Sequence, residues 1–167
     1  MNSGVVTSVL DDVIVSNGLG WTADRRTMFY IDSGTRAVDV FDVDDSDGAL
    51  HDRRRIAQLD FAVDEGPDGL AVDTDGCAWV ATWAGGCVRR YTPRGDLDIV
   101  VPIPMRDVTS VAFGGAGLDQ LYITTARSNL DAEALRLQPH AGDIFALDLS
   151  TTGISGVPIS RFGALSV

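Results

Sequence analysis

Two short motifs place oxygen-bearing side chains at matching points of the chain. Asn17 begins the segment Asn-Gly-Leu-Gly-Trp, and Asp68 begins the segment Asp-Gly-Leu-Ala-Val. Either dipeptide alone is an ordinary turn signal. A carboxylate and an amide carbonyl are also hard oxygen ligands, suited to calcium, magnesium or manganese, and zinc is not excluded. Because both residues hold the same register of a repeated pattern, they are candidates for facing a common site.

Other kinds of catalytic site find no support in the sequence. All 13 basic residues are arginine, which excludes a lysine Schiff base. The histidines, His51 and His140, show no zinc-site spacing and no pairing with a serine or cysteine nucleophile. Cys77 and Cys87 are not expected to form a disulfide, because a hairpin turn before Cys87 places them a strand length apart.

The net charge of the chain restricts the kinds of partner it can bind. The 24 acidic and 13 basic residues give a formal net charge of -11, and an acidic surface repels both nucleic acids and anionic membranes. No apolar run approaches the length of a membrane span. We therefore expect a cytoplasmic protein that binds neither nucleic acid nor membrane.

The elements that must position the two residues are nearly all strands. Short β-branched and aromatic runs are separated by turn residues, and similar segments begin at Asn17, Asp68 and Thr109. Four antiparallel strands in about 40 to 50 residues are typical of a β-propeller blade. The sequence thus predicts an all-β fold, a partial β-propeller of about three four-stranded antiparallel blades in a single half-propeller domain covering residues 1–167. The predicted blades lie near 17–66, 67–107 and 108–167, with a leading strand at 5–9 and one helix at 129–137 capped by Asn129.

The same segments resemble a known family. The stretches Ser16–Trp21, Phe29–Asp32, Pro67–Asp73, Leu121–Arg127 and Gln138–Phe145 are similar, in order, to the SMP-30/gluconolactonase/luciferin-regenerating enzyme family. The resemblance implies half of a six-bladed propeller with a divalent metal in its central channel, and hydrolysis of sugar lactones or related esters. It also implies that Asn17 and Asp68 are metal ligands and that Asp68 is the base that activates water.

One part of the family pattern is absent. The metal-binding glutamate near the family's N-terminus has no counterpart, and Glu65-Gly66-Pro67, which spells a similar motif, is interpreted as a loop. The site is therefore expected to be incomplete within one chain. Thr109, Ser110 and Arg127 are candidate substrate contacts at the channel mouth, whereas the three tryptophans are interpreted mainly as core residues.

Two interpretations follow. The first is a lactonase-like enzyme whose site is completed by a second copy or by an N-terminal half. The second is a non-catalytic half-propeller that serves as an assembly or binding module. A homodimer is expected in the first case, because three blades are half of six and because open end faces would expose apolar residues, which we place at Trp21, Phe29, Val111 and Phe113 or their neighbours.

Overall fold

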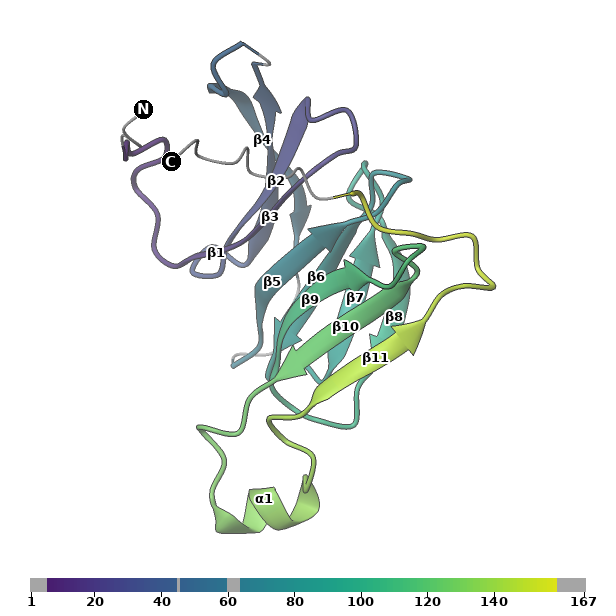
Figure 1. Cartoon of the computed structure of the whole chain (residues 1–167). Coiled ribbons are helices and arrows are strands. Elements are labelled where there is room, and N and C mark those ends of the chain that lie inside the picture. Colours follow the sequence, from purple (N-terminus) through teal and green to yellow (C-terminus); the bar gives the residue numbers. More distant parts are fainter. Residues whose placement is uncertain (1–5, 45, 60–63, 159–167) are drawn as a thin grey trace, which may run out of the picture.

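Three antiparallel sheets and one short helix make up the computed structural model, which describes residues 6–44, 46–59 and 64–158 (Figure 1). The first sheet has the order β1 (Ser16–Trp21), β2 (Thr27–Asp32), β3 (Ala37–Val43) and β4 (Leu50–Gln58). The second has the order β5 (Gly66–Val72), β6 (Ala78–Trp83), β7 (Cys87–Tyr91) and β8 (Leu97–Pro102). The third consists of β9 (Val108–Gly114), β10 (Gln120–Thr125) and β11 (Ile144–Asp148).

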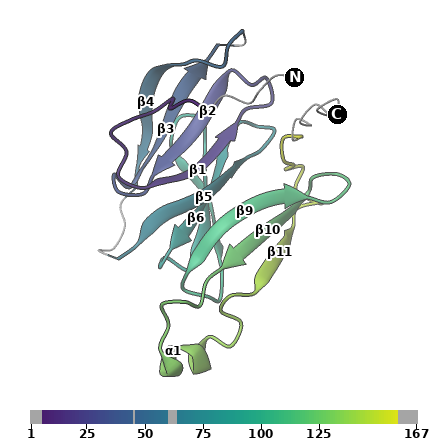
Figure 2. The same cartoon turned by 60° about the vertical axis from the view of Figure 1, so that its left-hand side comes forward.

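Each sheet runs from an inner to an outer strand in chain order, as a propeller blade does. The inner strands are neighbours, with β1 against β5 and β5 against β9 (Figures 1 and 2). The predicted all-β partial propeller is therefore confirmed. Among the described residues, no helix has the length and apolar character needed to cross a membrane.

The hydrophobic core lies between neighbouring blades. Phe29, at 2% exposure, belongs to the cluster that joins the first and second blades. Val111, at 5%, belongs to the cluster of Trp79 and Leu121 that joins the second and third. The expectation that Phe29 and Val111 lie on open faces is wrong, because their strands turn these side chains toward the adjacent blade. Phe113 is half-buried with its ring at right angles to that of Trp79, and of the four expected residues Trp21 alone is exposed.

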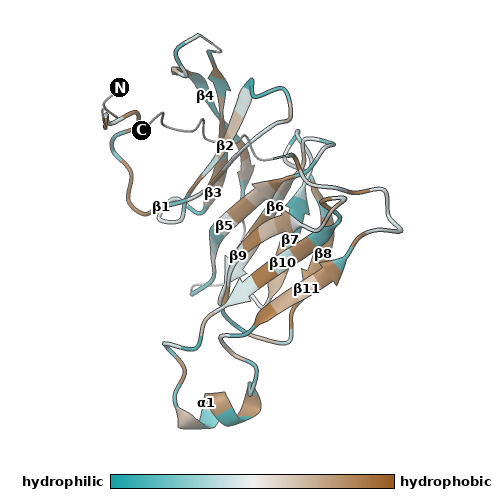
Figure 3. Ribbon diagram, viewed as in Figure 1, coloured by the Kyte–Doolittle hydropathy of each residue, from teal (hydrophilic) through white to brown (hydrophobic). Residues whose placement is uncertain are grey.

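The two end faces of the row of blades differ. On the first blade, Met28, Tyr30 and Phe41 are covered by Leu10 and Val13 from the segment that precedes β1. On the third blade, Tyr122 of β10 and Ile144 of β11 are exposed. Figure 3 shows β11 as a mostly hydrophobic strand and β10 as a mixed one, and the most apolar residues of β10, Leu121 and Ile123, are buried in the core. Apolar surface thus remains open at the third blade, while the chain itself covers part of the first.

Three further expectations differ from the structure. Residues 6–9 of the predicted leading strand form no strand, and Val5 lies outside the described residues. The third blade has three strands within the described part of the chain, because the segment after β11 returns to the second blade, where Gly156 bridges Asp73. The helix α1 spans Ala132–Leu137 and is capped by Asp131, whose carboxylate accepts the backbone N–H groups of residues 133 and 134.

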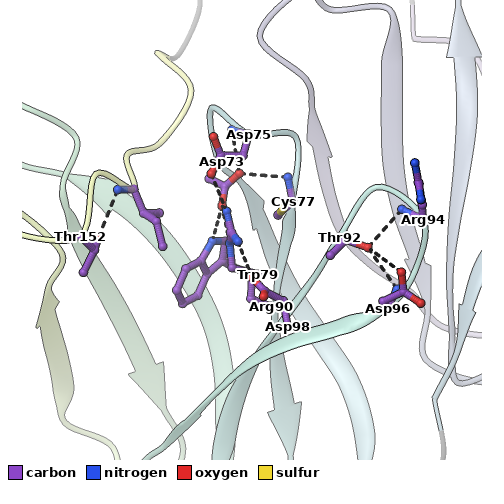
Figure 4. Close-up of polar contacts among 11 residues, drawn as sticks. Asp73, Asp75, Cys77, Trp79, Arg90, Thr92, Arg94, Asp96, Asp98 and Thr152 are labelled. Atoms are coloured by element: carbon purple, nitrogen blue, oxygen red, sulfur yellow. Dashed lines mark hydrogen bonds and ion pairs between the residues drawn. The ribbon is translucent and has the colours of Figure 1, made fainter.

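A buried ion network closes the second blade at the end of β5 that lies away from Asp68 (Figure 4). Asp73, at 1% exposure, accepts hydrogen bonds from Arg90 Nε at 2.7 Å and from Trp79 Nε1 at 2.9 Å. Arg90 also pairs with Asp75 and Asp98. Since the network links the end of β5 to residues on β6, β7 and β8, it fixes the strand that carries Asp68 within its blade.

Candidate metal centre

Asn17 and Asp68 each lie in a β-bulge near the beginning of an inner strand. In both strands, the residue and the glycine after it oppose one residue of the neighbouring strand, Ile31 in β2 and Ala81 in β6. β9 is irregular at the same register, where Thr109 is the extra residue. A bulge changes the direction in which a side chain points and is frequent next to functional sites. The repeated pattern of the sequence therefore corresponds to a repeated backbone distortion.

Close approach of the inner strands depends on the glycines that follow the two residues. A Cβ atom on Gly18 would lie 2.5 Å from the backbone nitrogen of Leu70, and one on Gly69 would lie 2.3 Å from Ser110 Oγ. Any side chain at these positions would push neighbouring strands apart. Glycine thus allows β1 to approach β5 closely enough for Asn17 to meet Asp68.

The two side chains line the same cavity. Asp68 is half-buried, and burial raises the pKa of its carboxyl group, while a hydrogen bond from Asn17 acts in the opposite direction. No arginine within the described part of the chain pairs with this carboxylate. An incompletely compensated carboxylate beside an amide is a suitable donor pair for a hard divalent cation. Cation binding would also favour the ionised form of Asp68.

The pair lies in a cavity of about 310 Å³ at the mouth formed by the beginnings of β1 and β5. Its walls are formed by residues from the first two blades, namely Val15, Asn17, Ser33, Arg36, Asp64, Glu65, Gly66, Pro67, Asp68 and Trp83. Of these ten, only Asn17 and Asp68 were identified as site residues from the sequence, and the other eight include the polar or aromatic residues Ser33, Arg36, Glu65 and Trp83. Ser33 and Arg36 lie in the turn between β2 and β3, Trp83 is the last residue of β6, and Glu65 directly precedes β5. Antiparallel topology brings these segments to the same end of the blades as Asn17 and Asp68.

The three candidate substrate contacts lie elsewhere. Thr109 forms a hydrogen bond of 2.7 Å with Thr124 across the third blade, and Ser110 packs against Gly69. Arg127 is exposed and packs against Gly142. None of the three lines the cavity that holds Asn17 and Asp68. Their role in substrate binding stays a prediction.

A larger cavity, of about 850 Å³, lies toward the other end of the inner strands. Its walls include the apolar side chains of Leu19, Trp21 and Phe113, and neither Asn17 nor Asp68 contributes to them. Thr22, Arg25 and Asp44 are the polar residues of its wall, which is otherwise mainly apolar. The smaller cavity, which holds the carboxylate and the amide of the repeated motif, is the better candidate for chemistry.

The number of protein ligands limits what the site can bind by itself. Among residues 6–44, 46–59 and 64–158, no three histidine, cysteine, aspartate or glutamate side chains come together to hold a metal ion. Asn17 and Asp68 fit a divalent cation as two of its oxygen ligands, and calcium alone takes six to eight. The remaining ligands would have to come from water or from another polypeptide.

Comparisons with known proteins bear on this geometry. Residues 1–127 match the model of the SMP-30/Gluconolactonase/LRE-like region. Regucalcin of Oryctolagus cuniculus is 40% identical over 154 residues, which cover 92% of this chain and 50% of the relative. The chain thus spans about half the length of the curated relatives it matches.

Solved structures agree with the match. The calcium-binding protein regucalcin of Agrobacterium tumefaciens superimposes with a TM-score of 0.85 at 26% identity, covering 95% of this chain and 54% of that one. A gluconolactonase of Xanthomonas campestris gives a TM-score of 0.57 at 31% identity, covering 69% and 36% of the two chains.

Replacing Gly18 with alanine tests the contact between the inner strands. The new Cβ would lie 2.5 Å from a backbone atom of β5, and overpacking of this kind costs about 1 to 3 kcal/mol of unfolding free energy. Gly66→Ala is the matched control, because a Cβ there would meet no described atom within 4 Å. Urea unfolding of both variants makes the comparison. Equal stabilities of Gly18→Ala and wild type would show that the strands do not depend on this glycine.

Proposed function

The chain belongs to the SMP-30/gluconolactonase/LRE-like family, and on that premise we propose that it is the metal-binding part of a hydrolase of sugar lactones or related esters. The observation that carries the proposal is that Asn17 and Asp68 lie in matching bulges of adjacent inner strands and line one cavity. The names of two relatives add support, since one is called a calcium-binding protein and another a gluconolactonase.

Asn17 and Asp68 would hold the cation through the amide oxygen and the carboxylate. Such an ion polarises a carbonyl oxygen and lowers the pKa of bound water. The ionised Asp68 carboxylate accepts a proton from the water that attacks the lactone carbonyl carbon. As the bond from that carbon to the ring oxygen breaks, Asp68 returns the proton to the oxygen that leaves. Trp83 and Pro67 form part of the cavity wall beside this carboxylate.

Where water does not supply the remaining ligands, a further polypeptide completes the set. A second copy of this chain is one source, and an N-terminal half is the other. In support of a second copy, Tyr122 and Ile144 leave an apolar face on the third blade. If two copies closed a six-bladed ring, Leu10 and Val13 would have to leave the face of the first blade that they now cover.

A non-catalytic assembly or binding module is the second candidate. The observation in its favour is that the other two carboxylates of the cavity wall are paired, Asp64 with Arg106 and Glu65 with Arg89. In the described ranges, no three acidic, histidine or cysteine side chains come together to hold an ion. Under this alternative the chain keeps the blade fold and its apolar end face but hydrolyses no lactone.

Hydrolysis of a panel of sugar lactones, measured with calcium or manganese and again with a chelator, separates the two candidates. We expect wild-type hydrolysis to require the cation, and Asp68→Ala to reduce it by at least about 100-fold, because the variant loses both a ligand and the base. The control is Asp96→Ala, which changes an exposed carboxylate in the turn between β7 and β8. Undiminished hydrolysis by Asp68→Ala would remove this residue from the site, and an inactive wild type would favour the binding module.

Light scattering at micromolar concentration tests the proposed second copy. We expect a mass above the 17.7 kDa of one chain, and we expect Tyr122→Arg to reduce it by placing a charge on the exposed face of the third blade. Leu137→Arg, on the exposed side of α1, is the control and should leave the mass unchanged. A wild-type mass of 17.7 kDa would reject self-association and leave the N-terminal half as the source of the missing ligands.

A further inference from the structure

Ser33, in the turn that joins β2 to β3, forms hydrogen bonds with Asn17 and with the backbone of Pro67. Its hydroxyl group donates a hydrogen bond of 2.6 Å to the carbonyl oxygen of Pro67, the residue before Asp68. The same oxygen accepts a hydrogen bond of 3.1 Å from Asn17 Nδ2. The hydroxyl therefore links the side chain of Asn17 on β1 to the backbone of β5.

The direction of these hydrogen bonds fixes the orientation of the Asn17 amide. A serine hydroxyl has one hydrogen, and Ser33 uses it on Pro67, so that only its lone pairs face Asn17. The NH₂ end of the amide can satisfy those lone pairs, whereas the oxygen end would be repelled by them. Because Asn17 donates to Ser33 through Nδ2, the oxygen end of its amide is turned away from the hydroxyl group. The amide oxygen is left for a cation.

The backbone around Ser33 holds the hydroxyl in place. The N–H group of Ser33 donates to the carbonyl of Val15 at 3.0 Å. The neighbouring Asp32 is 2% exposed and accepts the backbone N–H groups of Ile14, Val15 and Gly34. Burial alone would raise the pKa of Asp32, but these three hydrogen bonds hold it below its usual range, so the carboxylate anchors the turn in ionised form.

We propose that Ser33 is a positioning residue that turns the side-chain oxygen of Asn17 toward the cation. This inference rests on the proposed function, because it concerns a ligand of the same site. Residues that orient metal ligands in this way typically contribute 10- to 100-fold to metal affinity. Ser33 would act through Asn17 and would not touch the cation itself.

Calorimetric titration with calcium chloride, and with manganese chloride as a second probe, tests the inference on wild type and Ser33→Ala. We expect Ser33→Ala to bind the cation about 10- to 100-fold more weakly. Thr35→Ala is the matched control, because Thr35 lies in the same turn and its hydroxyl donates to the Asp32 carbonyl at 3.0 Å without contacting Asn17. Ser33→Thr keeps the hydroxyl and should restore binding.

A double-mutant cycle separates orientation from general destabilisation. Aspartate at position 17 has two equivalent oxygens and needs no orienting partner, so in the Asn17→Asp background Ser33→Ala should change affinity by less than about 3-fold. An equal loss in both backgrounds would overturn the inference, because it would indicate a structural effect. If Ser33→Ala does not fold, Ser33→Cys replaces it, since a thiol of similar size is a weak acceptor.

The outcomes distinguish this inference from the proposed function. Wild type that binds neither cation contradicts both. Wild type that binds, together with Ser33→Ala that binds equally tightly, contradicts the role of Ser33 and leaves the metal site standing.

Discussion

The approach of one inner strand to the next determines what this half-propeller can do. Gly18 lies against the backbone of β5 and Gly69 against Ser110, at distances that admit no side chain. The bulges in β1 and β5 fall at the same points, so the residues before the glycines leave the regular ladder. The placement of Asn17 beside Asp68, their cavity and the hydrogen bonds of the Ser33 hydroxyl group all depend on that spacing.

The buried ion network and the candidate metal site lie at opposite ends of β5. After the last residue of β5, Arg90 donates a hydrogen bond to the buried Asp73 carboxylate and neutralises its charge. Arg90 also pairs with Asp75 and Asp98, so the network connects the four strands of the second blade. At the mouth, Asp68 is half-buried beside an amide alone, and its pKa is raised by burial. A partly buried carboxylate without a cationic partner slightly lowers the stability of the cation-free protein. The same carboxylate favours binding of a cation, and such perturbed groups are common at functional sites.

The sequence predicted the inner elements well because their signals are local. Alternating apolar residues and turn residues identified the strands, and the shared register of Asn17 and Asp68 identified the pair that meets. The hydrogen bonds of Ser33 and the position of Trp83 at the cavity could not be predicted from local signals, because they depend on which turns lie at the same end of a blade. Phe29 and Val111 were misplaced because alternation shows that a face is buried but not which neighbour covers it. Within the described residues the third blade has three strands, because the segment around Gly156 pairs with the second blade, and local sequence signals do not predict such a long-range pairing.

Locating a cation in crystals of the chain is the most direct test of the central claim that adjacent inner strands build one metal site. Crystals grown with manganese chloride, measured at the manganese absorption edge, give an anomalous difference map that identifies the ion independently of the refined coordinates. The account predicts a peak about 2.0 to 2.6 Å from Asn17 Oδ1 and from the Asp68 carboxylate. A manganese peak at another place in the chain, with no peak beside Asn17 and Asp68, would contradict it.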